Sequence, residues 1–290
     1  MDKHLMQQNP KKLRPIVNQS EPVTVNINVY IFALLQVNHI RQTLEISFVY
    51  NITWKDELLT WNPEDYGGIN AFVPETASIW MPFLSCYNCL EMNIFKDEQS
   101  PVTIYQDGVV VWQPRKKFEV FCNIKVRYFP FDEQICKIQF FPMKHFYFEV
   151  LLKEASNSVQ KVFYIENGEW EMKNNKVNSY FHTISKSSIL EVTLNMERRP
   201  LYFLLNIISP IVLLSFLNLF TFCLPDDSGE KILFSLTMLL SQTVFLGTIS
   251  SSLPATSIEI VYITYYITCL LGSSCLITIA SITLLYFNHK

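Results

Sequence analysis

Two cysteines, Cys122 and Cys136, flank an aromatic-proline-aromatic-aspartate stretch, and their spacing permits one kind of covalent chemistry. In an oxidising compartment the pair can close a loop of about 15 residues, worth roughly 3 kcal/mol on a chain-entropy estimate. Inside the loop, the sequence FPFD at 129–132 offers an apolar side chain, a fixed turn and one charge. A disulfide that served packing alone would not need this tip. We therefore expect the tip to be exposed and to touch something, such as the membrane end of the chain.

The sequence offers little that could carry catalysis. The five histidines show no HExxH spacing, there is no GxSxG turn, and the seven glycines form neither GxGxxG nor GxxxxGK. The scattered carboxylates are typical of a solvated surface. We expect no enzyme and no cofactor. The net charge of −3 shows no excess of basic residues. Charge therefore gives no argument that the chain binds nucleic acid.

Charged residues become rare after about residue 200, although the chain is 49% hydrophobic overall. Three apolar runs, at 201–224, 232–253 and 258–286, each reach the roughly 20 residues that a helix needs to cross a bilayer. Three buried helices of a large soluble core would be the alternative, but so few charges over such lengths favour membrane spans. The short connectors predict adjacent antiparallel helices in a lipid bilayer.

The side of the membrane on which the N-terminal region lies is indicated only weakly. Arg198 and Arg199 favour a cytoplasmic start of the first span, but long domains are translocated regardless of flanking charge. Two glycosylation sequons, at Asn18 and Asn51, favour the outside. The first residues lack the apolar core of a signal peptide, so we expect a signal that was removed or lost from the gene prediction.

Residues 23–200 are expected to form an all-β sandwich after an N-terminal segment at 1–22. The stretches VTVNINVYIFALL and LEISFVYNITW are rich in β-branched and aromatic residues and partly alternate in polarity. Turn signals follow at regular intervals, including Asp107-Gly108 inside TIYQDGVVVW, which predicts a hairpin. The predicted organisation is therefore a β-sandwich domain at 23–200 followed by a membrane domain at 201–290.

The cysteine-flanked stretch resembles the signature loop of the Cys-loop, or pentameric ligand-gated, ion channels. The likeness extends over about residues 23–290 and is closest to the nicotinic and serotonin-gated cation-channel branch. It is carried by the segments WKDELLTWNPEDYGGI (54–69), IWMPFLSCYN (79–88), VVWQP (110–114), GEWE (168–171), RRPLYFLLNIISPIVLLSFL (198–217) and SGEKILFSLTMLLSQTVFL (228–246).

The resemblance implies a homo- or heteropentamer of related subunits with an extracellular sandwich that binds a small agonist between subunits. It also implies a pore lined by the second membrane helix and a location in the plasma membrane, including synapses. The family has four membrane helices, whereas this sequence stops just past the third. We expect the sequence to be a truncated gene prediction, a splice form or a fragment.

The second apolar run has one face that fits a pore. Every third or fourth position gives Glu230, Leu233, Thr237, Leu240, Val244, Thr248 and Ser251. Five copies would form a constriction at Leu240 and Val244 that can gate by dewetting, with a Glu230 ring that attracts monovalent cations. The alternative for Glu230 is an acid in the first turn of a helix, favoured by the helix dipole. Leu233 departs from the small hydroxyl residue usual there and narrows that end.

The resemblance also assigns a junction between the two domains. Phe131 and Asp132, at the loop tip, would press on the connector that begins at Pro254. Asp132 would form a charged junction with Arg198 or Arg199, and agonist motion would pass through it to the gate.

The ligand site is where the sequence departs from the family, whose relatives hold a cationic amine in a cage of aromatic rings. Tyr87 matches the first aromatic, and Tyr180 and Phe181 lie on the capping loop. Met143 stands where a tryptophan is expected, Val49 and Ser187 replace two further aromatics, and the paired adjacent cysteines are absent. We expect the nearby Phe140, Phe141 and Phe146 to belong mainly to the core. The ligand residues are thus Tyr87, Met143, Tyr180 and Phe181, without an ordinary acetylcholine site.

The sequence CYNC places Cys86 and Cys89 around Tyr87. The two cysteines can form a local disulfide, stay reduced, or join a metal site with His145 or His182. A single CxxC without a second pair is a weak zinc signal, so no metal is predicted. Cys223, Cys269 and Cys275 lie in the predicted spans and are expected to pack as small apolar residues.

Two functions remain open from the sequence. The first is a subunit of a neurotransmitter-gated cation channel, which the pore face and the junction favour. The second is a non-conducting accessory subunit that assembles with related subunits, which the altered ligand site and the absent fourth helix favour. A membrane-anchored adhesion protein is a remote third, because it needs no Glu230 face.

Overall fold

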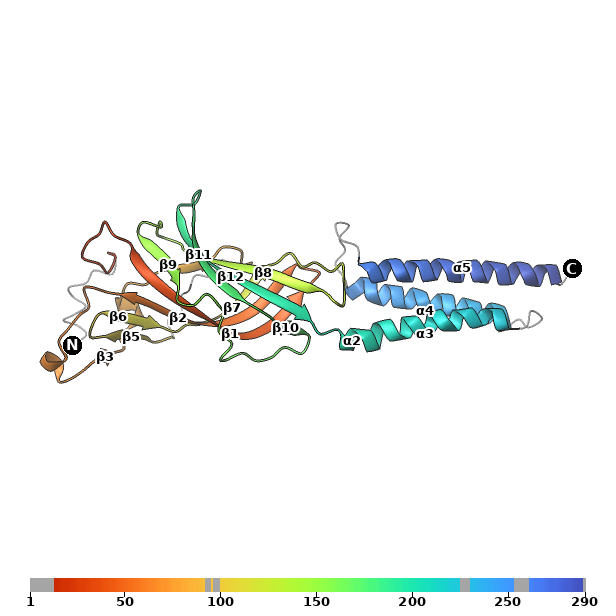
Figure 1. Ribbon diagram of the computed structural model, residues 1–290, viewed down its shortest axis with the longest axis horizontal. Helices are drawn as coiled ribbons and strands as arrows, with labels where there is room; N and C mark the ends of the chain where they lie inside the picture. The colour runs from red at the N-terminus through yellow and green to blue at the C-terminus, as the bar shows by residue number, and fades with distance from the viewer. Residues whose placement is uncertain (1–12, 92–94, 96–99, 225–229, 253–260, 289–290) are drawn as a thin grey trace.

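The computed structural model describes residues 13–91, 95, 100–224, 230–252 and 261–288. These residues form a β-sandwich from which three long helices extend, and the C-terminus lies at the far end of α5 (Figure 1). The predicted fold class, an all-β sandwich followed by a transmembrane helical bundle with three spans, is confirmed.

The larger sheet is built around two long strands, β1 (Val23–Asn38) and β2 (Thr43–Lys55), which pair antiparallel. Its seven strands follow the order β3-β5-β6-β2-β1-β9, with β7 also paired to β2. Along β1 buried and partly exposed residues alternate, because successive side chains point to opposite faces of a sheet. The other strands are β3 (Ala71–Phe72), β5 (Val102–Tyr105), β6 (Val109–Trp112), β7 (Arg115–Phe121) and β9 (Val150–Glu154).

The smaller sheet has five strands in the order β10-β12-β8-β4, with β11 also paired to β12. Two short 3₁₀ helices lie between β2 and β4, η1 (Pro63–Tyr66) and η2 (Thr76–Ser78). The strands are β4 (Leu84–Cys86), β8 (Glu133–Pro142), β10 (Trp170–Met172), β11 (Lys176–His182) and β12 (Ser187–Arg198).

The predicted Asp107-Gly108 hairpin is confirmed, since β5 and β6 pair antiparallel across it. Gly108 has a φ of +81°, a left-handed conformation that glycine adopts without a steric penalty.

Aromatic side chains from both sheets fill the core. The ring of Tyr50 on β2 lies 5.7 Å from that of Phe140 on β8 and 5.0 Å from that of Phe95. Phe118 on β7 completes the cluster, 5.3 Å from Phe140. Edge-to-face packing of this kind adds to the hydrophobic gain of burying large rings and fixes the two sheets against each other.

The first membrane-length segment is interrupted where Pro210 removes a backbone donor and crowds the preceding turn. A π-helix ends two residues before the proline, as such bulges commonly accommodate a break in the hydrogen-bond ladder. The segment comprises α2 (Leu201–Phe203), the π-helix η3 (Leu204–Ile208), α3 (Ser209–Leu219) and the 3₁₀ turn η4 (Phe220–Cys223).

The other long helices are α4 (Glu230–Ser252) and α5 (Tyr262–Asn288). Within the described residues, three segments are long and apolar enough to cross a membrane, namely Leu201–Cys223, Glu230–Ser251 and Tyr262–Leu284. The second helix begins two residues before the predicted start of its span, at Glu230, which places this carboxylate in the first turn.

Candidate functional site

Cys122 and Cys136 form a disulfide. Cys136 lies on β8 and Cys122 follows β7, so the Cys122–Cys136 disulfide joins the two sheets. Both residues are buried. The loop between them lies at the end of the sandwich that faces the helices (Figure 1).

The loop tip is less exposed than the sequence suggested. Phe131 is 61% exposed, but Phe129 and Asp132 are buried, at 7% and 2%. Phe129 turns inward because its ring packs 4.8 Å from that of Phe203 in α2, and Asp132 turns inward because it is paired with an arginine. The expectation of an exposed tip was therefore wrong for these two residues and right for Phe131.

The tip nevertheless contacts the helices directly. The ring of Tyr128 lies 5.5 Å from that of Tyr262 at the start of α5, and the Tyr262 amide donates a hydrogen bond to the Arg127 carbonyl at 3.2 Å. Together with the Phe129–Phe203 contact, this ties the loop to two membrane-length segments. Pro254 lies outside the described residues.

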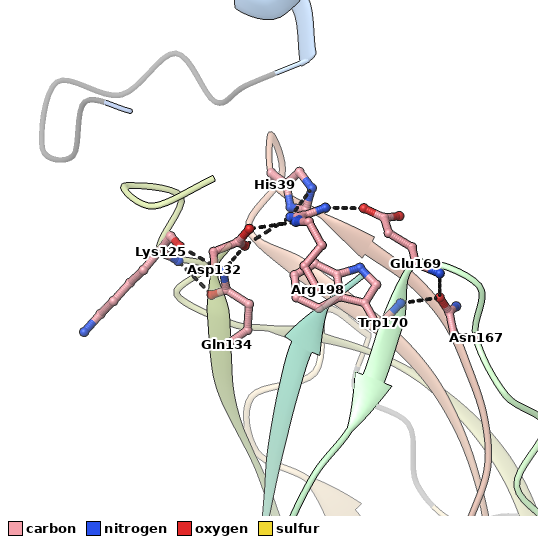
Figure 2. Close-up of polar contacts among 8 residues, drawn as sticks. All are labelled: His39, Lys125, Asp132, Gln134, Asn167, Glu169, Trp170 and Arg198. Atoms are coloured by element: carbon pink, nitrogen blue, oxygen red, sulfur yellow. Dashed lines mark hydrogen bonds and ion pairs between the residues drawn. The ribbon is translucent and has the colours of Figure 1, made fainter. Parts of the chain in front are cut away.

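Arg198, the last residue of β12, is the centre of a buried polar cluster that we call the junction (Figure 2). Its guanidinium donates to both carboxylate oxygens of Asp132, at 2.7 and 3.1 Å, and to Glu169. Its side chain is fully buried, and Asp132 also accepts a hydrogen bond from Gln134 at 2.6 Å. A buried charge pair is stable only when its remaining hydrogen-bonding groups are satisfied, and this one meets that condition.

Aromatic rings and a histidine complete the junction. The guanidinium carbon of Arg198 lies 4.2 Å from the ring centroid of Trp170, a cation–π distance. Nη2 of Arg198, which also donates to Asp132, lies 3.0 Å from Nε2 of His39, in the turn between β1 and β2. Because Arg198 can only donate, His39 must accept at Nε2 and is therefore neutral in this arrangement.

The protonation states follow from burial. Desolvation, with the nearby Arg198 charge, lowers the pKa of His39 from 6.5 to about 4, and Asp132 opposes this only in part. Burial raises the pKa of Glu169, against the attraction of Arg198. His39 was not identified from the sequence, where no motif connects it to residues far along the chain.

Of the two arginines that were candidates for the junction, only Arg198 enters it. Arg199 points elsewhere and pairs with Glu166 at 3.4 Å, with both side chains largely exposed. The alternation along β12 could have distinguished the two arginines. Leu194, Met196 and Arg198 are two residues apart and share the buried side of the strand.

The predicted ligand residues lie on the outer surface of the sandwich, and two of them, Tyr87 and Phe181, contact other aromatic rings. The ring of Tyr87, which is 72% exposed, lies 6.2 Å from that of Phe141. Phe181 on β11 is 57% exposed, and its ring lies 5.5 Å from that of Tyr147, a residue the sequence did not single out. Met143 is exposed, in the position where relatives were expected to have tryptophan.

Tyr180 is fixed by polar contacts rather than by rings. Its hydroxyl accepts from Gln139 at 3.0 Å and donates to Glu191 at 3.4 Å, and Glu191 pairs with Lys137 at 2.8 Å. Among the three nearby phenylalanines, Phe140 is core as expected. Phe146 instead is exposed and stacks on Phe148, so the expectation of core packing was wrong for this residue.

The CYNC stretch forms the Cys86–Cys89 disulfide, one of the three alternatives left open by the sequence. His145 pairs with Glu149 at 3.6 Å, and His182 contacts Ser185 at 2.8 Å. Within the described parts of the chain, no group of three or more metal-ligating residues could hold an ion.

The two sequons differ in their surroundings. Asn18 is exposed and accepts hydrogen bonds from both the amide and the hydroxyl of Ser20. Asn51 lies within β2, and its side-chain oxygen is buried with no hydrogen-bond partner.

The helix α4 has one covered face and one open face. Its seven predicted pore residues are all exposed, whereas Ser235, Gln242 and Ile249 on the opposite side are buried. Gln242 accepts from Ser274 of α5 at 2.7 Å, and Ser274 accepts from Asn218 of α3 at 2.8 Å. Hydrogen bonds of this kind hold membrane helices together. Of the spans' cysteines, Cys223, Cys269 and Cys275 are exposed rather than packed, which corrects the expectation.

Comparison with known proteins divides the chain into the same two regions, the β-sandwich and the helices. Residues 1–200 match the neurotransmitter-gated ion-channel ligand binding domain, and residues 207–290 match the neurotransmitter-gated ion-channel transmembrane region. The chain is 32% identical over 274 residues to the acetylcholine receptor subunit alpha-type acr-16 of Caenorhabditis elegans, covering 93% of this chain and 54% of that protein. It is 33% identical over 261 residues to the human neuronal acetylcholine receptor subunit alpha-3, covering 88% and 51%.

A β-sandwich joined through a disulfide-closed loop to membrane-length helices defines a class of membrane proteins with a ligand-binding domain. The chain belongs to the neurotransmitter-gated ion-channel family. Its homologues are receptors rather than enzymes, in agreement with the expectation from the sequence. The chain spans about half the length of the curated relatives it matches.

Proposed function

We propose that the chain is a subunit of a pentameric cation channel of the plasma membrane, opened by a small agonist that binds the extracellular sandwich. The observation that carries the proposal is the open face of α4, where seven residues at helical spacing stay uncovered while the opposite face is buried. Five such faces would surround a pore with hydroxyl groups, an apolar belt at Leu240 and Val244, and a Glu230 ring that attracts cations.

The junction supports a route from ligand to pore. A displacement of β12 would act on Arg198, which is bound to the signature loop, and on α2, which begins three residues later. The loop in turn contacts α2 and α5 through Phe129 and Tyr128. We infer that the contacts at Arg198 transmit this displacement to the pore, and substitution of Arg198 tests this role in gating.

Current recording tests the proposal. Cells that express the chain, alone or with related subunits, would be exposed to acetylcholine, choline, serotonin, protons and zinc, and sodium would then be replaced by an impermeant cation. We expect a current that disappears on replacement. Leu240→Ala should shift gating, because it removes part of the apolar belt, whereas Leu239→Ala on the same helix turn should not. Equal effects of the two substitutions would contradict a pore-lining role for Leu240.

Two observations favour a second candidate, a non-conducting accessory subunit. Met143 is exposed on the proposed ligand surface in place of an aromatic ring, and Leu233, 64% exposed, adds bulk to the open face near Glu230. This function predicts silence when the chain is expressed alone, with altered currents from a co-expressed relative. Silence in both conditions, despite confirmed surface expression, would count against either function.

A further inference from the structure

The Cys86–Cys89 disulfide has no part in the function proposed above, yet it lies where the two sheets meet. Cys86 is the last residue of β4 in the smaller sheet. The backbone of Cys89 forms an isolated antiparallel β-bridge with Val120 on β7 of the larger sheet. The two residues between them, Tyr87 and Asn88, therefore span the edge of the sandwich within a ring closed by the disulfide.

Hydrogen bonds hold this ring to both sheets. On the β8 side, Tyr87 donates its amide to the Gln139 carbonyl at 2.8 Å, and the Gln139 amide donates to Oδ1 of Asn88 at 3.1 Å. Nδ2 of Asn88 donates to the Lys137 carbonyl at 2.7 Å. On the other side, the Phe121 amide donates to the Asn88 carbonyl at 2.9 Å. The conformation of the ring thus fixes both Tyr87 and Asn88.

The two disulfides of the sandwich differ in access. Cys122 and Cys136 are 6% and 1% exposed, so their bond is enclosed by the core. Cys86 is also buried, but Cys89 is only half-buried and is followed by Leu90, which is 42% exposed. An attacking thiolate needs access to one sulfur, and Cys89 is the most exposed of the four cysteines in the two disulfides.

The two disulfides also differ in the loops that they close. The cysteines of the first pair are separated by 3 positions and those of the second by 14. A shorter loop constrains the unfolded chain less, so the small ring contributes less to stability. Access therefore favours reduction of the Cys86–Cys89 bond before the other, and the shorter loop means that the fold loses less stability when this bond opens.

We propose that the Cys86–Cys89 disulfide is a site of thiol–disulfide exchange with small extracellular dithiols. A thiolate of the dithiol attacks Sγ of Cys89, the S–S bond breaks, and Cys86 leaves as a thiolate that takes a proton from water. The second thiol of the reagent then displaces Cys89 from the mixed disulfide. The reagent departs as a cyclic disulfide, having given two electrons to the protein, which now has two thiols.

Reduction should also affect the proposed ligand surface, and this consequence rests on the function proposed above. Opening the ring frees Tyr87 directly and releases the Asn88 contacts that hold the backbone of Gln139. The side chain of Gln139 donates to the Tyr180 hydroxyl at 3.0 Å and to Glu191 at 2.9 Å. Gln139 therefore connects Asn88 to Tyr180. A displacement of Asn88 on reduction should shift Tyr180 and so weaken the response to agonist.

Differential thiol labelling of the full chain at the cell surface tests the exchange without any need for current. Free thiols are first blocked with N-ethylmaleimide, dithiothreitol is added in steps, and new thiols are labelled and located by mass spectrometry. We expect Cys86 and Cys89 to be labelled at a dithiol concentration about tenfold lower than Cys122 and Cys136. Labelling of both pairs together, or of the Cys122 pair first, would overturn the proposal.

Two further readouts separate the exchange from its effect on function. Amide hydrogen exchange at 84–90 should become faster after mild reduction, and the double variant Cys86→Ser/Cys89→Ser should show the fast exchange without reductant. If the channel conducts, the dithiol should raise the half-maximal agonist concentration severalfold in the wild type and leave the double variant unchanged. An unaltered wild-type response would overturn the link to Tyr180, whereas labelling decides on the exchange even if no current is found.

Discussion

Protonation of His39 should destabilise the chain as the pH falls, and the size of the effect follows from the junction. In the fold, Nε2 of His39 accepts a hydrogen bond from Arg198, and burial lowers the pKa of His39 from 6.5 to about 4. Between these two pKa values, His39 is protonated in the unfolded chain but not in the folded chain. The stability is fully present above pH 6.5 and is lost as the pH falls towards 4.

The magnitude can be worked out from these two pKa values. Between pH 7 and pH 5, the difference in proton binding lowers the free energy of unfolding by about 2 kcal/mol. For a domain of this size class, such a loss corresponds to a fall of roughly 4–8 °C in the unfolding midpoint. The Glu169 carboxyl, whose pKa is raised, acts in the opposite direction, so the effect of His39 must be isolated by substitution.

Thermal unfolding followed by tryptophan fluorescence, in detergent micelles at pH 7 and pH 5, would measure this effect. The control is His39→Gln, which keeps an oxygen acceptor for Arg198 but cannot be protonated in this range. Glu169, Asp132 and all other groups titrate in both proteins, so the difference between them reports His39. Equal shifts of the midpoint in wild type and His39→Gln would refute the reasoning.

Two other predictions concern stability. Asp132→Asn should destabilise the chain by about 3–5 kcal/mol, since it leaves the fully buried Arg198 without the buried carboxylate that accepts two of its hydrogen bonds, whereas Glu166→Gln, which removes an exposed ion pair, should cost less than about 1 kcal/mol. Similar losses in the two variants, measured by chemical unfolding, would contradict this. Gly108→Ala should lower the unfolding midpoint more than Gly67→Ala, because both residues have positive φ but only the first would place a methyl group against a backbone carbonyl oxygen. Midpoints that fall equally would show that steric overlap adds nothing to the backbone strain.

Much of the architecture could be predicted because it depends on local periodicity. Alternating polarity indicated the strands of the sandwich, and long apolar runs indicated three spans, because one sheet face and one bilayer thickness impose these patterns. The helical spacing of the α4 face was equally visible, from Glu230 to Ser251. These features depend on what lies a few residues away along the chain.

The junction could be predicted only in part, because its members come together from four distant segments. Asp132 was expected to pair with Arg198 or Arg199, but the burial of the pair that forms, Asp132 with Arg198, depends on the rings of Trp170 and Phe129. The choice between the two adjacent arginines required the phase of β12, and His39 had no local signal at all. The aromatic pairing of Tyr147 with Phe181 was missed for the same reason, since it joins a loop to a neighbouring hairpin.

The strand β12 connects the proposed ligand surface to the membrane-length helices. Glu191, which holds Tyr180, and Arg198 lie seven positions apart on it, or about 23 Å along an extended strand. At its end the Arg198 amide donates to the Asp132 carbonyl at 3.2 Å, and the Arg199 amide donates to the Glu169 carbonyl at 2.7 Å, just before α2 begins. A strand fixed so closely at its end cannot slide without either moving α2 or breaking these bonds. We therefore expect substitutions at Arg198 to affect the transmission of agonist binding rather than the binding itself.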